Sequence, residues 1–185
     1  MTDLRYPIGK FEWTQPDTEE QAAKDRARSI DVLSKTPLQM RSAIQGLNAE
    51  QFDTPYRPEG WTVRQVVHHV PDSHMNAYIR FKLALTEAEP QVRAYDQAEW
   101  AKLPDSQITP PEVSLQLLAA LHSRWVDLLQ SMRPSDFERT LYHPEHGVLT
   151  LEQMLAMYAW HCEHHLAHIT SLRERRGWNQ RAAAS

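Results

Sequence analysis

Four long stretches of the chain carry apolar residues at intervals of three and four, which is the spacing of one face of an α-helix. Helices that each bury one apolar face pack most simply against one another. The pattern therefore predicts an all-α, single-domain four-helix bundle that includes residues 1–185. The four stretches run from Glu19 to about Leu47, from Thr62 to Leu85, from Thr109 to about Met132, and from Thr150 to Gly177.

Polar residues mark where the predicted helices begin. In a capping box, a polar residue and a Gln or Glu three positions later bond each other's backbone amides. Thr109, which is followed by two prolines and Glu112, is the expected N-cap of the third long helix. Gly177 is expected to end the fourth. The capping-box pairs are Asn48 with Gln51, Thr62 with Gln65, and Thr150 with Gln153.

Prolines and turn residues interrupt the pattern. Pro37 and Pro71 lie inside two of the helical stretches, where a proline removes a backbone hydrogen bond and bends the helix. We expect long loops, one of them with a helical turn, to carry function or to cover one end of the bundle. The remaining expected segments are an extended arm over 1–17, loops over 89–110 (turn at 97–103) and 134–147, and a frayed tail over 179–185.

Composition narrows the functional classes. The formal net charge is -4 with both signs interspersed, so no nucleic-acid or membrane partner is expected. No apolar window approaches the roughly 18 residues that span a bilayer. The single cysteine, Cys162, cannot form an intramolecular disulfide, and the first ten residues lack a signal-peptide pattern. These features predict a cytoplasmic protein.

Seven of the ten histidines fall in two short windows. His161 and His165 are four residues apart, so their imidazoles lie on one helix face and can converge on one ion. They continue an apolar stripe, which points both rings into the bundle, where imidazoles without partners are costly. His69 occupies the inward stripe of the second long helix. The three form a candidate metal site with an open fourth position.

Alternatives to these ligands remain open at this stage. His69 can instead hydrogen-bond a carbonyl or the carboxylate of Asp72. His164 and His168 share the four-residue spacing but lie about 60 degrees off the stripe, closer to the edge of the bundle. The remaining competitors for a ligand role are His68 and His74.

Two long motifs resemble the YfiT branch of the DinB-like superfamily. They are Trp61–Asn76 (WTVRQVVHHVPDSHMN) and Tyr158–Ile169 (YAWHCEHHLAHI), supported by the shorter Tyr6–Gly9 and Asp53–Arg57. The resemblance covers nearly the whole chain and implies a four-helix bundle, a homodimer, and one zinc or nickel ion per chain, with zinc preferred. The ligands it implies here are His69, His161 and His165. The chain departs from the family pattern at Pro71, where Ala is expected.

Two enzymatic interpretations follow from an ion held by three imidazoles. If the ion activates a water molecule, the reaction on a small-molecule substrate is hydrolysis. If it binds a low-molecular-weight thiol, the resemblance implies a bacillithiol-type S-transferase that conjugates the thiol to electrophiles. A non-catalytic, metal-stabilised dimeric bundle is the third interpretation.

Other polar residues near the motifs have weaker claims to a role. No general base stands out: Asp72 is expected to orient a ligand imidazole at most, and Glu163 to be solvated. Cys162 is expected to pack in the core. Arg80 and Lys82 could meet an acidic substrate, although charges on a long helix are usually solvated.

Overall fold

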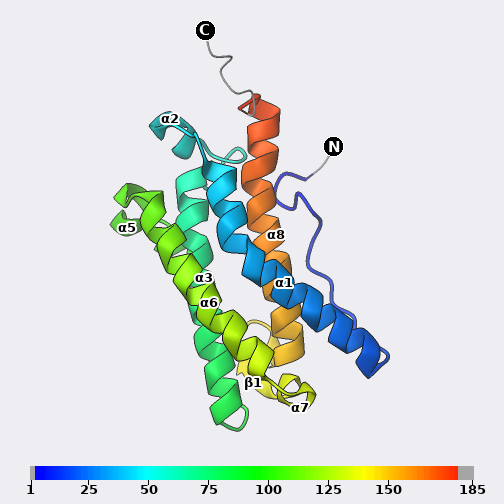
Figure 1. The fold of residues 1–185 in the computed structure, drawn as a ribbon. Helices are drawn as coiled ribbons and strands as arrows, with labels where there is room; N and C mark the ends of the chain where they lie inside the picture. The colour runs from blue at the N-terminus through cyan, green and yellow to red at the C-terminus, as the bar shows by residue number, and fades with distance from the viewer. Residues whose placement is uncertain (1–2, 179–185) are drawn as a thin grey trace.

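Four long helices dominate the computed structural model, which describes residues 3–178 (Figure 1). Short helices and one two-stranded sheet lie in the connections between them. In chain order the elements are α1 (Glu19–Ile44), α2 (Ala49–Phe52), α3 (Val63–Thr86), α4 (Gln97–Trp100), α5 (Pro104–Ile108), α6 (Pro111–Ser131), α7 (Pro134–Phe137), β1 (Thr140–His143), β2 (Gly147–Thr150) and α8 (Leu151–Arg176).

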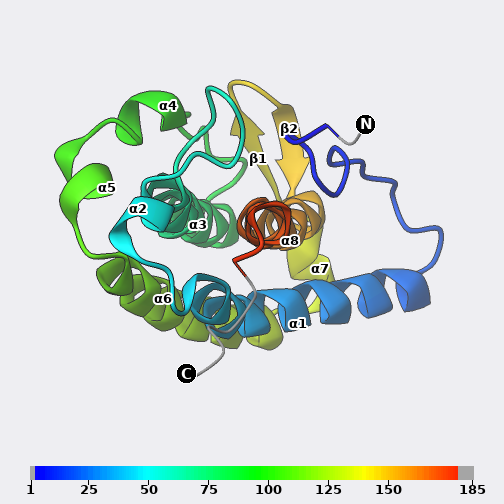
Figure 2. The ribbon, with the colours of Figure 1, turned by 90° about the horizontal axis from the view of Figure 1, so that it is seen from above.

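The order and direction of the long helices explain the long connections. Helix α1 packs against α8 and α6, and α3 packs against the same two helices. Figure 1 shows that α3 and α6 run in one direction and α1 and α8 in the other. Because α3 and α6 are consecutive and parallel, the chain must return along the bundle between them. Residues 87–110, with α4 and α5, make this crossover, and Figure 2 shows them outside α3.

The capping predictions are confirmed at most helix ends. All three capping boxes form, and Gly177 ends α8 in the left-handed conformation at φ 67. The predicted cap at Thr109 is wrong, because α6 begins at Pro111 with Pro110 before it and no side-chain cap. A residue that precedes proline is disfavoured in the helical region, so Pro110 cannot become the first helical residue ahead of Pro111. Thr109 instead ends α5.

Both internal prolines lie within unbroken helices. Helix α1 continues through Pro37 and α3 continues through Pro71. A proline has no amide to donate, so Pro37 leaves the carbonyl of Leu33, four residues earlier, without its helical partner. This free carbonyl is used by a side chain of another helix, as described below.

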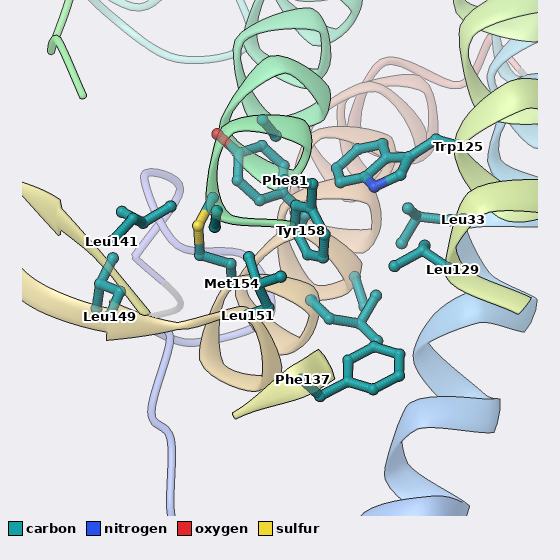
Figure 3. Packing of buried hydrophobic residues seen from close by; sticks show 14 of the residues in the cluster. Leu33, Phe81, Trp125, Leu129, Phe137, Leu141, Leu149, Leu151, Met154 and Tyr158 are labelled. Carbon is teal, nitrogen blue, oxygen red and sulfur yellow. The ribbon is translucent and has the colours of Figure 1, made fainter. Parts of the chain in front are cut away.

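The connection before α8 contains a hairpin where the sequence analysis expected only a loop. Strands β1 and β2 pair antiparallel, with Leu141 opposite Leu149. These two side chains are buried, whereas Tyr142 and Val148 on the other face are exposed. Four-residue strands give too short an alternation for a sequence pattern to show. Figure 3 shows Leu141 and Leu149 next to Met154 of α8, so the hairpin closes one side of the core.

The core consists of two apolar clusters. One includes Leu33, Phe81 and Trp125 at the hairpin end of the bundle (Figure 3). The other includes Val66 and Leu118 at the end near α2. Histidines from three of the long helices are buried in the same interior. Mostly helical and built on four long helices, the chain has the fold class predicted from its sequence.

The segment that precedes α1 is irregular. The arm over residues 3–17 has no helix or strand, as expected, and the predicted tail over 179–185 lies outside the described residues. None of the helices in residues 3–178 is both long and apolar enough to pass through a lipid bilayer.

Candidate metal centre

Three imidazoles from two helices meet inside the bundle. Helix α3 provides His69, and α8 provides His161 and His165 one turn apart. One nitrogen of each ring lies within 4.8 Å of the others. The Nε2 atoms of His69 and His161 are 3.2 Å apart. The structure thus brings together all three histidines that the sequence analysis selected.

The spacing of these nitrogens suits a single small cation. Two imidazoles that bind one tetrahedral zinc ion at about 2.0–2.1 Å have their nitrogens roughly 3.3 Å apart. His69 and His165 are buried and His161 is partly exposed. No oxygen or sulfur ligand of the described residues joins this group. The donor set is therefore a three-nitrogen site with room for a further ligand.

A chain of hydrogen bonds starts from His161 and crosses the bundle. Its Nδ1 lies 3.0 Å from Nε2 of His74, whose Nδ1 lies 2.8 Å from Nε2 of His122. Nδ1 of His122 lies 2.7 Å from the carbonyl oxygen of Leu33. This is the carbonyl that Pro37 leaves without a helical partner. Helices α8, α3, α6 and α1 each contribute one member.

The carbonyl at the end of the chain fixes the protonation of every ring. A carbonyl only accepts, so Nδ1 of His122 carries a hydrogen, and in a neutral ring its Nε2 must then accept. Nδ1 of His74 therefore donates the hydrogen bond to His122. In the same way, Nδ1 of His161 donates the hydrogen bond to His74. The lone pair of His161 is left on Nε2, which faces His69.

A second, shorter chain orients His165 in the same way. Nε2 of His168 lies 3.1 Å from the carbonyl oxygen of Arg5, so this nitrogen donates. Nδ1 of His168 must then accept, and it lies 3.4 Å from Nδ1 of His165. The lone pair of His165 is consequently also on Nε2. Two carbonyls, those of Leu33 and Arg5, thus direct two ring nitrogens towards one centre.

Burial keeps these imidazoles neutral. Desolvation, the largest cause, and neighbouring histidines lower the pKa of His69 to about 3. Burial likewise lowers the pKa of His161, His165 and His74 well below the ordinary value, and that of His122 to about 4. Metal ligation requires the neutral imidazole, so burial prepares the site for a cation.

His164 and His168 are buried more deeply than the sequence analysis expected. The exposed fraction of His168 is 2% and that of His164 is 7%. The N-terminal arm covers them, because Tyr6 lies over His164 and the carbonyl of Arg5 binds His168. Tyr56, in the connection after α2, also stacks on His168 at a ring distance of 3.9 Å. Helical periodicity cannot foresee this cover, which comes from segments without regular structure.

The other competitors are engaged elsewhere. His68 lies within hydrogen-bond distance of Ser114 and of the carbonyl of Thr109, on the side of α3 that faces α6. His69 has neither a carbonyl nor Asp72 as a hydrogen-bond partner among residues 3–178. Asp72 is half-buried, and burial followed by the charge of Asp105 raises its pKa to about 6. Its carboxylate therefore does not orient a ligand imidazole here.

Two other groups of candidate ligands occur in the described residues. Cys162 packs beside His74 and His122, and burial raises the pKa of its thiol to about 12. The nitrogens of these two rings already form the hydrogen bonds that connect His161 to the carbonyl of Leu33. This arrangement therefore favours hydrogen bonding over the binding of a second ion. Buried His143 forms a third group with the exposed Glu145 and His146 at the hairpin turn. Glu163 is exposed, as expected.

A cavity of about 680 Å³ opens beside the trio. His161 is the only member of the trio that lines it, among residues 3–178. The other two rings are covered by Trp61, whose ring centroid is 4.6 Å from that of His69. A small molecule would therefore reach the centre past His161. Arg80, for which the sequence analysis left open contact with an acidic substrate or a solvated position, is 7% exposed and lines the same cavity.

The bundle and its site define the class of protein: a four-helix protein with a buried three-histidine centre at the end of a cavity. The chain belongs to the DinB superfamily, whose model matches residues 17–169. This confirms the family that the sequence motifs indicated.

Relatives and a solved structure agree with this assignment. The chain is 53% identical over 178 residues to proteins named "Putative metal-dependent hydrolase" from Bacillus mycoides (strain KBAB4) and Bacillus cereus (strain B4264), covering 96% of this chain and 100% of each relative. It also matches the structure of YfiT from Bacillus subtilis with a TM-score of 0.89 and 47% identity. That match covers 95% of this chain and 99% of YfiT, which is described as "a probable metal-dependent hydrolase with an unusual four-helix bundle topology".

The lowered histidine pKa values predict acid sensitivity of the metal-free protein. An imidazole with a pKa near 6.5 when unfolded and about 3–4 when folded binds its proton more readily in the unfolded chain. The free energy of unfolding is therefore highest above pH 6.5 and falls as the pH decreases, by about 1.4 kcal/mol per pH unit for each such imidazole. Urea unfolding after chelation, at pH 7.5, 6.5 and 5.5, measures this. Equal stability at all three values would contradict the burial of neutral rings.

Proposed function

We propose that this protein is a metal-dependent hydrolase that holds one divalent ion per chain, zinc in preference to nickel, through His69, His161 and His165. The observation that carries the proposal is the convergence of three neutral imidazoles, two of them aimed by hydrogen-bonded chains, at the end of a cavity. The names of the Bacillus relatives support the hydrolytic activity.

The residues around the centre have separate tasks in this reaction. When bound, the ion supplies a Lewis acid that activates a water molecule for attack on the substrate. Trp61 keeps bulk water away from the rings of His69 and His165. His161 borders the cavity, so the substrate enters on its side. The hydroxyl of Tyr158, beside Ser73 and Arg80, offers a hydrogen bond to a substrate near His161.

A thiol S-transferase is the second candidate. The cavity of about 680 Å³ is large enough for a low-molecular-weight thiol together with a small electrophile. The thiol would be the co-substrate that meets the ion, and no residue of the chain would need to act as the nucleophile. Cys162 is unsuited to that task, because it is buried and its pKa is raised.

A homodimer is expected for either enzyme, and a non-catalytic dimeric bundle is the third candidate. Neighbouring helices α1 and α6 expose Leu38, Val113 and Leu117, with exposed fractions of 70%, 52% and 42%. Exposed apolar side chains on adjacent helices favour association with a second copy. Equilibrium sedimentation of the purified chain tests this, and a monomer at micromolar concentration would exclude it.

The ligand assignment predicts which variants lose the metal. Each of three variants should bind far less than one equivalent of zinc per chain, because two imidazoles cannot hold the ion tightly. These variants are His69→Ala, His161→Ala and His165→Ala. Metal content of protein purified without a histidine tag measures this. The matched control is His164→Ala, which removes the neighbouring buried imidazole and should keep a full equivalent. Retention of a full equivalent by both His161→Ala and His165→Ala would defeat the assignment.

The hydrogen-bonded chains predict a weaker effect at a distance. His122→Phe and His168→Phe keep an aromatic ring but remove the partners that fix the tautomers of the ligands. Zinc affinity, measured by competition with a chelator, should fall roughly ten- to hundredfold in each. His164→Phe should leave it unchanged. An unaltered affinity in folded His122→Phe and His168→Phe proteins would show that the chains do not orient the ligands.

Two assays separate the enzymatic candidates. The hydrolase should cleave a model ester or amide without added thiol, and it should lose this activity when the metal is removed. The transferase should instead form an adduct between a low-molecular-weight thiol and a chlorodinitrobenzene only when loaded with metal. A dimeric, metal-loaded protein that does neither would favour the non-catalytic bundle over our proposal.

A further inference from the structure

We propose that Arg80 forms the anion-binding end of the cavity beside the metal centre, so that the substrate is a small molecule with a carboxylate on the part that does not react. This inference rests on the proposed function, because it places the reacting bond at the His161 end. It concerns one residue of α3 that neither the family motifs nor the predicted ligand set includes.

Arg80 is a buried cation that has no counter-ion in the part of the chain that the structure describes. Its exposed fraction is 7%, yet no carboxylate of residues 3–178 lies within 4.0 Å of its guanidinium. Its Nη2 donates to the carbonyl oxygen of Arg93 at 2.6 Å. A guanidinium has five N–H donors, so this bond leaves donors for the cavity that Arg80 lines. A buried charge without a counter-ion is costly, and a bound anion would supply that counter-ion.

Three titratable groups that face Arg80 are neutral at pH 7. They come from three segments: Tyr158 of α8, Tyr95 of the crossover and His143 of β1. Burial is the largest cause of each shift: it raises the pKa of Tyr95 to about 12 and that of Tyr158 above its ordinary value, and it lowers that of His143. None of them therefore neutralises the guanidinium.

Neither of the carboxylates that line the cavity forms an ion pair with Arg80. Asp96 accepts hydrogen bonds from the amides of Ala98 and Glu99 at 2.9 and 3.0 Å, where it caps α4. Glu145 is exposed at the hairpin turn. Both carboxylates lie beyond salt-bridge distance of Arg80, so neither of them pairs directly with its guanidinium.

Tyr158 connects this charge to the candidate metal centre. Its ring centroid is 5.6 Å from that of His161, and its hydroxyl lies beside Ser73 and Arg80. A bound molecule can therefore extend over one tyrosine side chain, with one end at His161 and the other at Arg80. The substrate is then held at two points, which fixes the position of its reacting bond.

A carboxylate fits this end better than a phosphate. A guanidinium matches the planar carboxylate with two parallel hydrogen bonds, and one positive charge balances one negative charge. The surrounding hydroxyls of Ser73, Tyr95 and Tyr158 are neutral hydrogen-bonding groups. The described part of the cavity has no second lysine or arginine to balance a doubly charged phosphate.

Hydroxamates that bind a metal at one end and carry a carboxylate at the other test the proposal. The probes are the monohydroxamates of dicarboxylic acids with two to four methylene groups, each compared with the carboxamide that replaces its carboxylate. Calorimetry with zinc-loaded protein should show that the best acid binds roughly ten- to hundredfold more tightly than its amide. Arg80→Gln keeps a donor for the carbonyl of Arg93 but removes the charge, so it should abolish this preference.

Controls separate recognition from a purely structural role of Arg80. Lys82→Gln removes an exposed cation two residues away that does not line the cavity, and it should keep the full preference. Arg80→Lys keeps the charge, should retain part of the preference, and replaces Arg80→Gln if that variant does not fold. No preference in the wild type, or the same preference in Arg80→Gln or Arg80→Lys as in the wild type, would overturn the proposal.

An experiment on the metal-free protein distinguishes failure of this inference from failure of the proposed function. Glutaramate, which carries a single carboxylate, should bind the chelated wild-type protein, and Arg80→Gln should weaken this binding at least tenfold. If hydroxamates do not bind through a metal but glutaramate binding still depends on Arg80, the metal assignment fails and the anion site stands. Tighter binding of inorganic phosphate than of glutaramate would overturn the choice of a carboxylate.

Discussion

The need to satisfy buried, neutral imidazoles is the constraint on which the centre of this bundle depends. Each neutral ring has one nitrogen that donates and one that accepts, so burying a ring is costly unless these nitrogens find suitable partners. Two chains of rings meet this requirement by ending at backbone carbonyls, those of Leu33 and Arg5. The direction of both chains leaves lone pairs facing one point, which a cation would satisfy.

The backbone provides the end of each chain in an unusual way. A carbonyl inside a helix is normally occupied by the amide four residues later, and Leu33 is available because that residue is Pro37. The second carbonyl, that of Arg5, comes from an arm without regular structure. A proline in α1 and an irregular arm thus both help to decide which nitrogen carries the hydrogen in the imidazoles of α8. Neither provides a member of the trio itself.

The topology of the bundle gives the site its cavity. Because α3 and α6 are parallel, a long crossover must pass along the bundle, and a hairpin lies next to it before α8. Tyr95 of the crossover and His143 of the hairpin enclose the space between Arg80 and His161. The long connections, which the sequence analysis expected to carry function or to cover one end, form walls of the cavity beside the candidate centre.

The sequence by itself determined the four long helices, most of their caps, the family and the three histidines that meet, because helical periodicity and capping depend on residues within a few positions of one another. Only the tertiary structure decided the start of α6, the hairpin, the burial of His168 and Arg80, and the chains through His74 and His122. The partners of His122 lie 48 and 89 residues away in the sequence. Contacts over such separations depend on how the helices pack, which local patterns do not encode.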